Sequence, residues 1–209
     1  ISQKYVTDAL KVVTIYDILN TNLIRMMSKS QGFKDDFDGI RLVTVGRMVP
    51  PKAYDLAVLA ADELKSRGYR FKWSFVGNGS DRPKVEKMIA DRHLENYVEL
   101  LGEQSNPYPY MAACDVYVQT SRFEGFGLTV REARILGKAE VCTNFPSAYN
   151  QIVDGENGLI CEMNPKSIAD KIELLLTDND LKRKLEVAVA KEDNCTAETE
   201  GAKVRALLS

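Results

Sequence analysis

Short apolar segments alternate with longer, helix-like segments through the middle of this chain. The apolar segments have the length of strands, and they cover residues 41–46, 71–76, 97–101, 115–119 and 140–143. Strands that alternate with helices of roughly 10–15 residues are typical of βαβ units, whose strands form a parallel sheet. We therefore expect an α/β fold built on a Rossmann-like, doubly wound parallel sheet. Such sheets bind ligands at the carboxyl ends of their strands.

The chain divides into two parts around this alternation. Residues 1–39 combine a strand-like stretch (12–19), a short helix near 23–27 and a polar linker, and we interpret them as a hinge segment. Residues 40–209 form the domain itself, which becomes helical from Pro165 onward. Its other helices are predicted from apolar residues at helical spacing, and they cover residues 54–67, 81–92 and 127–136.

Charge and composition exclude several classes of protein. The chain has 28 Lys+Arg and 30 Asp+Glu, a formal net charge of −2, so it lacks the strongly basic character of a nucleic-acid-binding protein. No apolar run approaches the roughly 20 residues of a membrane span. The amino end has no initiator Met and no signal-peptide pattern, and we expect the natural protein to continue before Ile1.

Cysteine and histidine give no sign of a metal site or of disulfides. The single histidine, His93, cannot build a zinc site alone, and we expect it at an exposed helix end. We interpret the four cysteines as buried, reduced thiols, which favours a cytoplasmic protein. They are widely spaced and form no CxxC pair: Cys114, Cys142, Cys161 and Cys195.

The strongest local signal is the stretch of residues 121–137. A predicted strand ends near Gln119, a glycine-containing loop follows, and a helix begins near Gly127. The first N–H groups of a helix have no intrahelical acceptor and bind anions readily. Gly125 and Gly127 remove side chains that would block a close approach. The pattern therefore predicts a phosphate cradle.

Two glutamates accompany this cradle. Glu124 lies in the loop, and Glu132 lies more than a turn into the helix among apolar residues. Glutamate is seldom placed in such surroundings without a partner. Its carboxylate can accept two hydrogen bonds at once, as the diol of a ribose would offer.

The spacing of these glutamates resembles the E-x7-E motif of the group-1 retaining glycosyltransferases with the GT-B fold. The resemblance runs from about Val12 to Leu208, in the family's order. An ordinary nucleotide-binding α/β domain with coincidental acids is the alternative. The further motifs that match are Arg122-Phe-Glu-Gly-Phe-Gly127, Gly137-Lys138, Val45-Gly-Arg47, Pro51-Lys52, Gly77-Asn-Gly79 and Asp154-Gly-Glu-Asn-Gly158.

The resemblance implies roles for individual residues. Arg47 and Lys52 correspond to the basic pair that holds the donor diphosphate, where fixed cations stabilise the leaving oxyanion. Their alternative is an exposed loop with two solvated charges. Glu132 corresponds to the ribose-binding glutamate. Glu124 corresponds to the group that orients the transferred sugar, together with the backbone amides of Gly125, Phe126 and Gly127.

Further backbone contacts to the nucleotide are implied as well. The amides of Leu128 and Thr129 would meet the diphosphate. Gly46, Gly77 and Gly79 would let two loops approach the nucleotide, although a purely structural tight turn explains the last two almost as well.

The sequence departs from the family's pattern at a few positions. Ala53 stands where many relatives have glycine. Arg134 replaces an apolar helix residue, and Ala139-Glu140 replaces a proline and an apolar residue at a buried strand start. Neither Arg134 nor Glu140 belongs to the expected site, but Glu140 leaves the register of its strand open.

The resemblance implies the carboxyl-terminal half of a GT-B enzyme. Its reaction would transfer a hexosyl group from a nucleotide diphosphate sugar, with UDP-hexose favoured, to a hydroxyl with retention. No cofactor and no metal are expected, because Arg47 and Lys52 supply the positive charge. The glycan or lipid-linked acceptor would bind the absent amino-terminal domain, so this chain alone should be inactive.

The expected setting is cell-surface polysaccharide or glycolipid synthesis in the cytoplasm, at the inner face of the membrane. Two other functions stay open. One is a nucleotide-sugar epimerase on the same fold, and the other is a non-catalytic donor-binding subunit.

Overall fold

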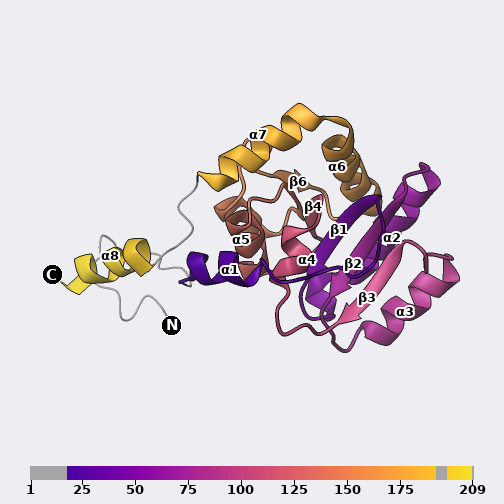
Figure 1. Ribbon diagram of the computed structural model, residues 1–209, viewed down its shortest axis with the longest axis horizontal. Helices are drawn as coiled ribbons and strands as arrows, with labels where there is room; N and C mark the ends of the chain where they lie inside the picture. Colours follow the sequence, from indigo (N-terminus) through magenta and orange to yellow (C-terminus); the bar gives the residue numbers. More distant parts are fainter. Residues whose placement is uncertain (1–17, 192–196, 209) are drawn as a thin grey trace.

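The computed structural model describes residues 18–191 and 197–208. These residues form a six-stranded sheet in which all neighbouring strands are parallel (Figure 1). The order is β3-β2-β1-β4-β5-β6, so it reverses between β1 and β4, the switch point where doubly wound sheets bind ligands. The predicted α/β, Rossmann-like fold class is thus confirmed. The strands are β1 (Ile40–Val45), β2 (Phe71–Val76), β3 (Val98–Gly102), β4 (Val116–Gln119), β5 (Glu140–Thr143) and β6 (Leu159–Cys161).

The predicted helices are present, with three additional short elements. The first five strands also agree with prediction to within a residue, whereas β6 was not predicted. The predicted helices are α1 (Thr21–Met27), α2 (Tyr54–Ser66), α3 (Arg82–Asp91), α5 (Leu128–Ile135), α6 (Pro165–Thr177), α7 (Asn179–Ala190) and α8 (Ala197–Leu208). The additional elements are α4 (Tyr108–Ala112) and two 3-10 turns, η3 (Pro50–Lys52) and η4 (Pro146–Asn150).

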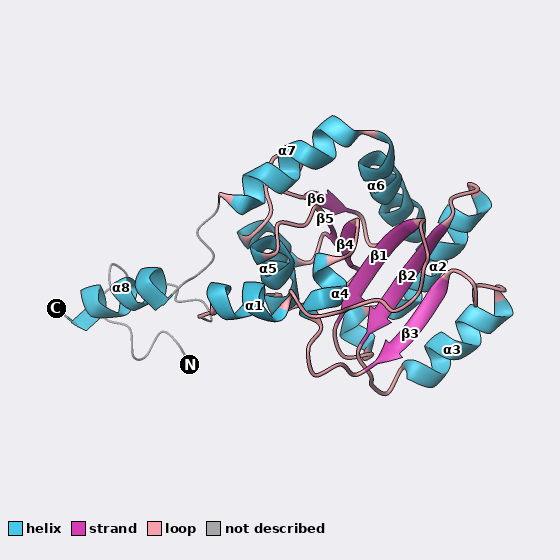
Figure 2. Cartoon of the chain, viewed as in Figure 1, coloured by secondary structure: helices cyan, strands magenta, loops and turns pink. Residues whose placement is uncertain are grey.

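Helices cover both faces of the sheet (Figure 2). Because side chains alternate along a strand, Leu42 packs into one core with α2 and α6, whereas its neighbour Val43 packs into a second core with α5. Trp73 is fully buried in the first core and Tyr117 in the second. Because helices cover both faces of the sheet, the loops at the strand ends are the place for a ligand site.

The segment before β1 lies against the domain. The Arg25 Nε donates to the carbonyl of Ile135 at 3.3 Å, which joins α1 to the end of α5. The Asn106 amide donates to the carbonyl of Met27 at 2.9 Å. Most of the strand expected over residues 12–19 lies outside the described residues, so the hinge role of residues 1–39 stays a prediction.

The two charged residues at predicted core positions, Arg134 and Glu140, are partners of each other. Arg134 and Glu140 form an ion pair in which both side chains are fully buried. Glu140 stands opposite Tyr117 in the ladder between β4 and β5, which fixes the register of its strand. Arg134 also donates to the carbonyl of Asn157 at 3.2 Å, so the pair reaches the turn before β6.

The described cysteines are buried and the histidine is exposed, as the sequence predicted. Cys114, Cys142 and Cys161 are buried and free, and burial raises the pKa of Cys114 to about 12. Cys195 lies outside the described residues. His93 is exposed just after α3. Within the described ranges, no helix is long and apolar enough to cross a membrane, and no three potential metal ligands gather.

Candidate functional site

Two loops at the carboxyl edge of the sheet approach so closely that only glycine fits between them. A Cβ on Gly77 would lie 2.0 Å from the carbonyl oxygen of Gly46, and one on Gly79 would lie 2.3 Å from that of Met48. The Met48 N–H also donates to the carbonyl of Asn78 at 2.9 Å. This close packing gives Gly77 and Gly79 a structural role, which is one of the two interpretations that the sequence allowed.

Lys52 and Glu124 meet across the switch point. The Lys52 Nζ lies 2.6 and 2.8 Å from the two carboxylate oxygens of Glu124, although the residues are 72 positions apart in the chain. The side chain of Glu124 is 8% exposed and that of Lys52 is 20% exposed. A buried carboxylate of this kind needs a cation and hydrogen-bond donors to stay charged.

Two further side chains supply those donors. The Gln119 Nε2 lies 3.0 Å and the Ser121 hydroxyl 2.6 Å from Oε1 of Glu124. The Gln119 Oε1 in turn accepts from the hydroxyls of Tyr117 at 2.7 Å and Thr129 at 3.2 Å. Oε1 of Glu124 is therefore saturated, whereas Oε2 accepts from Lys52 and has room for another donor.

The loop that carries Glu124 is tied to the loop that carries Lys52. The N–H of Arg122 donates to the carbonyl of Pro51 at 2.8 Å. Its guanidinium binds both carboxylate oxygens of Asp55 at 2.8 Å. These contacts fix the relative position of the two loops, so the Lys52–Glu124 pair is set by the scaffold.

Helix α5 begins with a turn that no side chain caps. Gly127 caps it in the left-handed conformation (φ 84°). Within the described part of the chain, the N–H groups of Gly125, Gly127, Leu128 and Thr129 donate to no other residue. A Cβ on Gly125 would meet nothing within 4 Å, so that position faces open space. The backbone at the start of α5 thus has the open N–H groups that the predicted phosphate cradle requires, and phosphate binding there stays a prediction.

Glu132 lies one turn further along α5 and has one partner that the sequence did not indicate. The Tyr108 hydroxyl donates to Oε1 of Glu132 at 2.9 Å. Burial raises the pKa of Glu132, while the bond from Tyr108 partly offsets that rise. Burial beside the Glu132 carboxylate raises the pKa of Tyr108 to about 12. Tyr108 therefore stays protonated as a donor.

Arg47 is exposed beside a small pocket. Its side chain makes no hydrogen bond or ion pair with another described residue. The pocket has a volume of about 280 Å³ and is also lined by Gly46, Gly77 and Pro107. Pro107 directly precedes Tyr108, so the pocket lies between Arg47 and the turn that holds the partner of Glu132. The predicted residues thus share one edge of the sheet.

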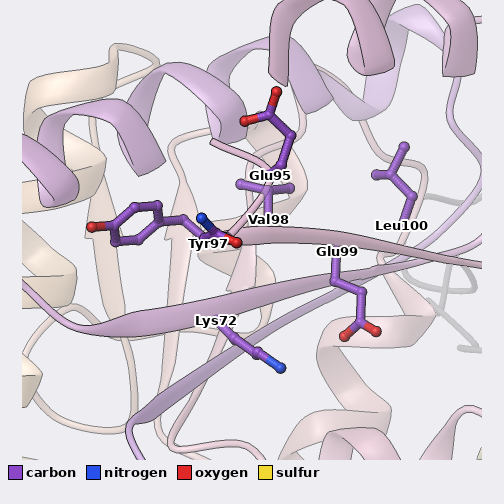
Figure 3. A pocket seen from close by; sticks show the side chains of 7 residues that line it. Lys72, Glu95, Tyr97, Val98, Glu99 and Leu100 are labelled. Carbon is purple, nitrogen blue, oxygen red and sulfur yellow. The ribbon is translucent and has the colours of Figure 1, made fainter. Parts of the chain in front are cut away.

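A larger hollow elsewhere contains none of the predicted residues. It follows the edge strand β3, has a volume of about 400 Å³, and is lined by residues such as Lys72, Tyr97 and Glu99 (Figure 3). None of its lining side chains has a buried polar atom that lacks a hydrogen-bond partner among the described residues. We therefore place the candidate site at the carboxyl edge, not at β3.

Comparison with known proteins identifies the family. Residues 29–192 match the family described as glycosyl transferases group 1. The chain is 32% identical over 177 residues to the poly(ribitol-phosphate) alpha-N-acetylglucosaminyltransferase of Staphylococcus aureus, covering 82% of this chain and 35% of that protein. It is 32% identical over 152 residues to an N-acetylgalactosaminyltransferase of Campylobacter jejuni that acts on a diphospho-undecaprenol substrate, covering 72% of this chain and 40% of that protein.

Solved structures agree with this assignment. The C-terminal domain of the group 1 glycosyl transferase LpcC from Francisella tularensis is similar with a TM-score of 0.64 at 26% identity, covering 84% of this chain and 92% of that domain. Anabaena HepE in complex with UDP-glucose has the same fold, with a TM-score of 0.80 at 20% identity over 93% of this chain and 56% of that protein. The chain spans about 35–40% of the length of the two relatives above. It belongs to the group 1 glycosyltransferase family, and its fold is the Rossmann-like domain of GT-B glycosyltransferases.

Proposed function

We propose that this chain is the donor-binding domain of a retaining hexosyltransferase that uses a nucleotide diphosphate sugar, with UDP-hexose favoured. One observation carries the proposal: the Lys52–Glu124 pair lies next to the uncapped first turn of α5, at the switch point of the sheet. A cation and free N–H groups at one place suit a diphosphate.

The chemistry assigned to these residues follows the charge that develops in the reaction. The bond between the anomeric carbon and the diphosphate oxygen breaks, and a bond from that carbon to the acceptor hydroxyl oxygen forms. The electron pair of the broken bond leaves with the diphosphate, which takes up the hydroxyl proton. Lys52, Arg47 and the N–H groups of Leu128 and Thr129 stabilise that oxyanion. Because these groups supply positive charge without a metal, we propose that donor binding needs no divalent ion.

The two glutamates have separate partners in this proposal. Oε2 of Glu124 accepts a hydroxyl of the transferred sugar, beside the amides of Gly125, Phe126 and Gly127. The oxygen of Glu132 that Tyr108 leaves free accepts from the ribose. Retention of configuration rests on the resemblance of the Glu124 and Glu132 spacing to the E-x7-E motif.

The acceptor belongs to the rest of the protein. The Staphylococcus relative acts on poly(ribitol-phosphate) and the Campylobacter relative on a lipid-linked sugar. We propose by analogy a hydroxyl of a surface glycan or of a lipid-linked glycan, modified at the cytoplasmic face of the membrane. A second domain would bind this acceptor, so the chain alone would bind donor without turnover.

The test is a calorimetric titration of the chain with UDP-, GDP- and ADP-sugars, with and without EDTA. We expect one nucleotide class, UDP, to bind, with an affinity that EDTA leaves unchanged. Binding that collapses with EDTA and returns with Mn²⁺ would contradict the metal-free mechanism. Failure of all three nucleotide classes to bind would overturn the donor-binding function itself.

A further inference from the structure

Gln151 is a buried side chain directly behind the glycine loop of the candidate site. It follows η4, and its side chain is almost fully buried. Its Nε2 donates to the carbonyl of Phe126 and, at 3.5 Å, to that of Gly127. Its Oε1 is buried and has no hydrogen-bond partner among the described residues. Gln151 is not among the residues to which the sequence assigned a role in the site.

The two contacted carbonyls set the direction of two N–H groups. In a trans peptide the N–H points opposite to the C=O of the same unit. A Phe126 carbonyl turned toward Gln151 therefore turns the N–H of Gly127 away from it. The Gly127 carbonyl also accepts from the N–H groups of Val130 and Arg131 at 3.0 and 3.3 Å, so Gln151 and the first turn of α5 together set its direction and that of the Leu128 N–H. Both N–H groups belong to the open turn at the start of α5.

The fit around Gln151 leaves little freedom for another arrangement. A Cβ on Gly127 would lie 3.3 Å from the Gln151 Nε2, closer than most such contacts. Gly127 also has a left-handed φ of 84°, which favours glycine. The loop thus brings its carbonyls against the amide because residue 127 has no side chain.

Burying a glutamine whose amide oxygen has no hydrogen-bond partner costs more free energy than burying an apolar side chain of similar size. Buried polar atoms without partners are rare in proteins and call for an explanation. An apolar side chain of similar size would fill the space but could not donate to either carbonyl. A glutamate would place carboxylate oxygens against two carbonyl oxygens. Glutamine keeps the shape and supplies the donor.

We propose that Gln151 is a positioning residue for the donor diphosphate, holding the carbonyls of Phe126 and Gly127 so that the N–H groups of Gly127 and Leu128 face the anion. This inference rests on the proposed function, since the anion it concerns is the diphosphate of the donor. Gln151 does not touch the donor. Its effect passes through the backbone of the loop.

The experiment uses pyrophosphate as a probe, because it carries the diphosphate charge without base or sugar. The 209-residue chain, labelled with ¹⁵N, is titrated with pyrophosphate and then with UDP-glucose. The variants are Gln151→Met and Gln151→Glu, which keep the shape and remove the amide donor. The control is Ile172→Val, a core change on the opposite face of the sheet.

We expect pyrophosphate to shift the amide resonances of Gly127 and Leu128 in the unaltered chain. Both Gln151 variants should bind it about ten-fold more weakly or worse, the loss for one hydrogen bond to a charged group. The Ile172→Val variant should lose thermal stability but keep its affinity, which separates positioning from general loosening. Should Gln151→Met not fold, Gln151→Glu decides alone.

Two results would overturn the inference. One is full pyrophosphate affinity in a folded Gln151 variant, and the other is binding that leaves the Gly127 and Leu128 resonances unmoved. The proposed function fails separately: if pyrophosphate binds through these amides but no nucleotide diphosphate sugar binds, the positioning role stands and the donor assignment is wrong.

Discussion

The guanidinium of Arg134 and the carboxylate of Glu140 form an ion pair from which solvent is fully excluded. Arg134 lies in α5, the helix whose first turn is the proposed anion cradle, and Glu140 begins β5, one strand further from the switch point. The pair therefore links the far end of the cradle helix to the sheet. Two charges that the core pattern did not lead us to expect become compatible with burial because each is the partner of the other.

Removing one member of this pair should be far worse than removing both. We expect Arg134→Leu or Glu140→Val alone to lower the free energy of unfolding by about 3–5 kcal/mol, because each leaves a buried charge without its partner. The double variant should recover most of that loss. Urea denaturation of the four proteins measures the coupling.

An exposed ion pair serves as the control for that cycle. Lys87 and Asp91 form an i,i+4 pair on α3 with side chains 74% and 51% exposed. We expect Asp91→Ala to change stability by less than about 0.5 kcal/mol. Equal losses at both pairs would show that burial of the Arg134–Glu140 pair is not what matters.

The sheet could be predicted from sequence because buried parallel strands are continuous apolar runs. The three-residue strand β6 is too short to give such a signal, and α4 begins within an Asn-Pro-Tyr-Pro stretch that is typical of a turn. Local pattern also placed Glu124 and Glu132 on the correct loop and helix. It could not supply Tyr108 or Gln151, because their contacts join residues 24 or 25 positions apart through the tertiary fold.

Substitution of Gly77 and of Gly125 should affect folding stability unequally, because only Gly77 is packed closely against backbone. An alanine at residue 77 places a methyl group on the Gly46 carbonyl at a φ of 142°, so we expect Gly77→Ala to lower stability by more than about 2 kcal/mol. Gly125→Ala should change stability by less than about 0.5 kcal/mol, since its Cβ meets open space. It should nevertheless weaken donor binding. Thermal denaturation and donor titration of both variants test this contrast.

Glu132 should reduce stability at neutral pH while it serves binding. Its raised pKa means that the folded state binds its proton more tightly than the unfolded state. The stability associated with that proton is present at low pH and is lost as the pH rises through the raised pKa. Above that raised pKa the buried carboxylate is charged, so there Glu132→Gln should increase the free energy of unfolding and weaken donor binding.

The pH dependence separates this effect from a general change in packing. The stability gain of Glu132→Gln should shrink as the pH falls, because the glutamate then becomes neutral as well. Denaturation curves from pH 7 down to pH 4 check the trend. A gain that stays constant over this range would indicate packing instead of charge burial.

Lys52 and Arg47 should both strengthen donor binding, but only Lys52 should also contribute to folding stability. Arg47 is exposed and unpaired among the described residues, so Arg47→Met should leave stability unchanged. Lys52→Met removes the cation from a carboxylate that is 8% exposed, and we expect a loss of about 1–3 kcal/mol. Both variants should bind UDP-glucose more weakly, because each removes a positive charge from the diphosphate site.

A second change at Glu124 tells these two roles of Lys52 apart. In the double variant Lys52→Met, Glu124→Gln, no charge is left buried without its partner, and the amide can still accept from Ser121. Stability should therefore return toward that of the unaltered chain, whereas the affinity for UDP, which lacks the sugar that Glu124 would contact, should stay low because the cation is still missing. Calorimetric titration and urea denaturation of the single and double variants measure both quantities. Recovery of UDP affinity together with stability would mean that Lys52 acts on the site only by compensating the charge of Glu124, and its direct contact with the diphosphate would have to be abandoned.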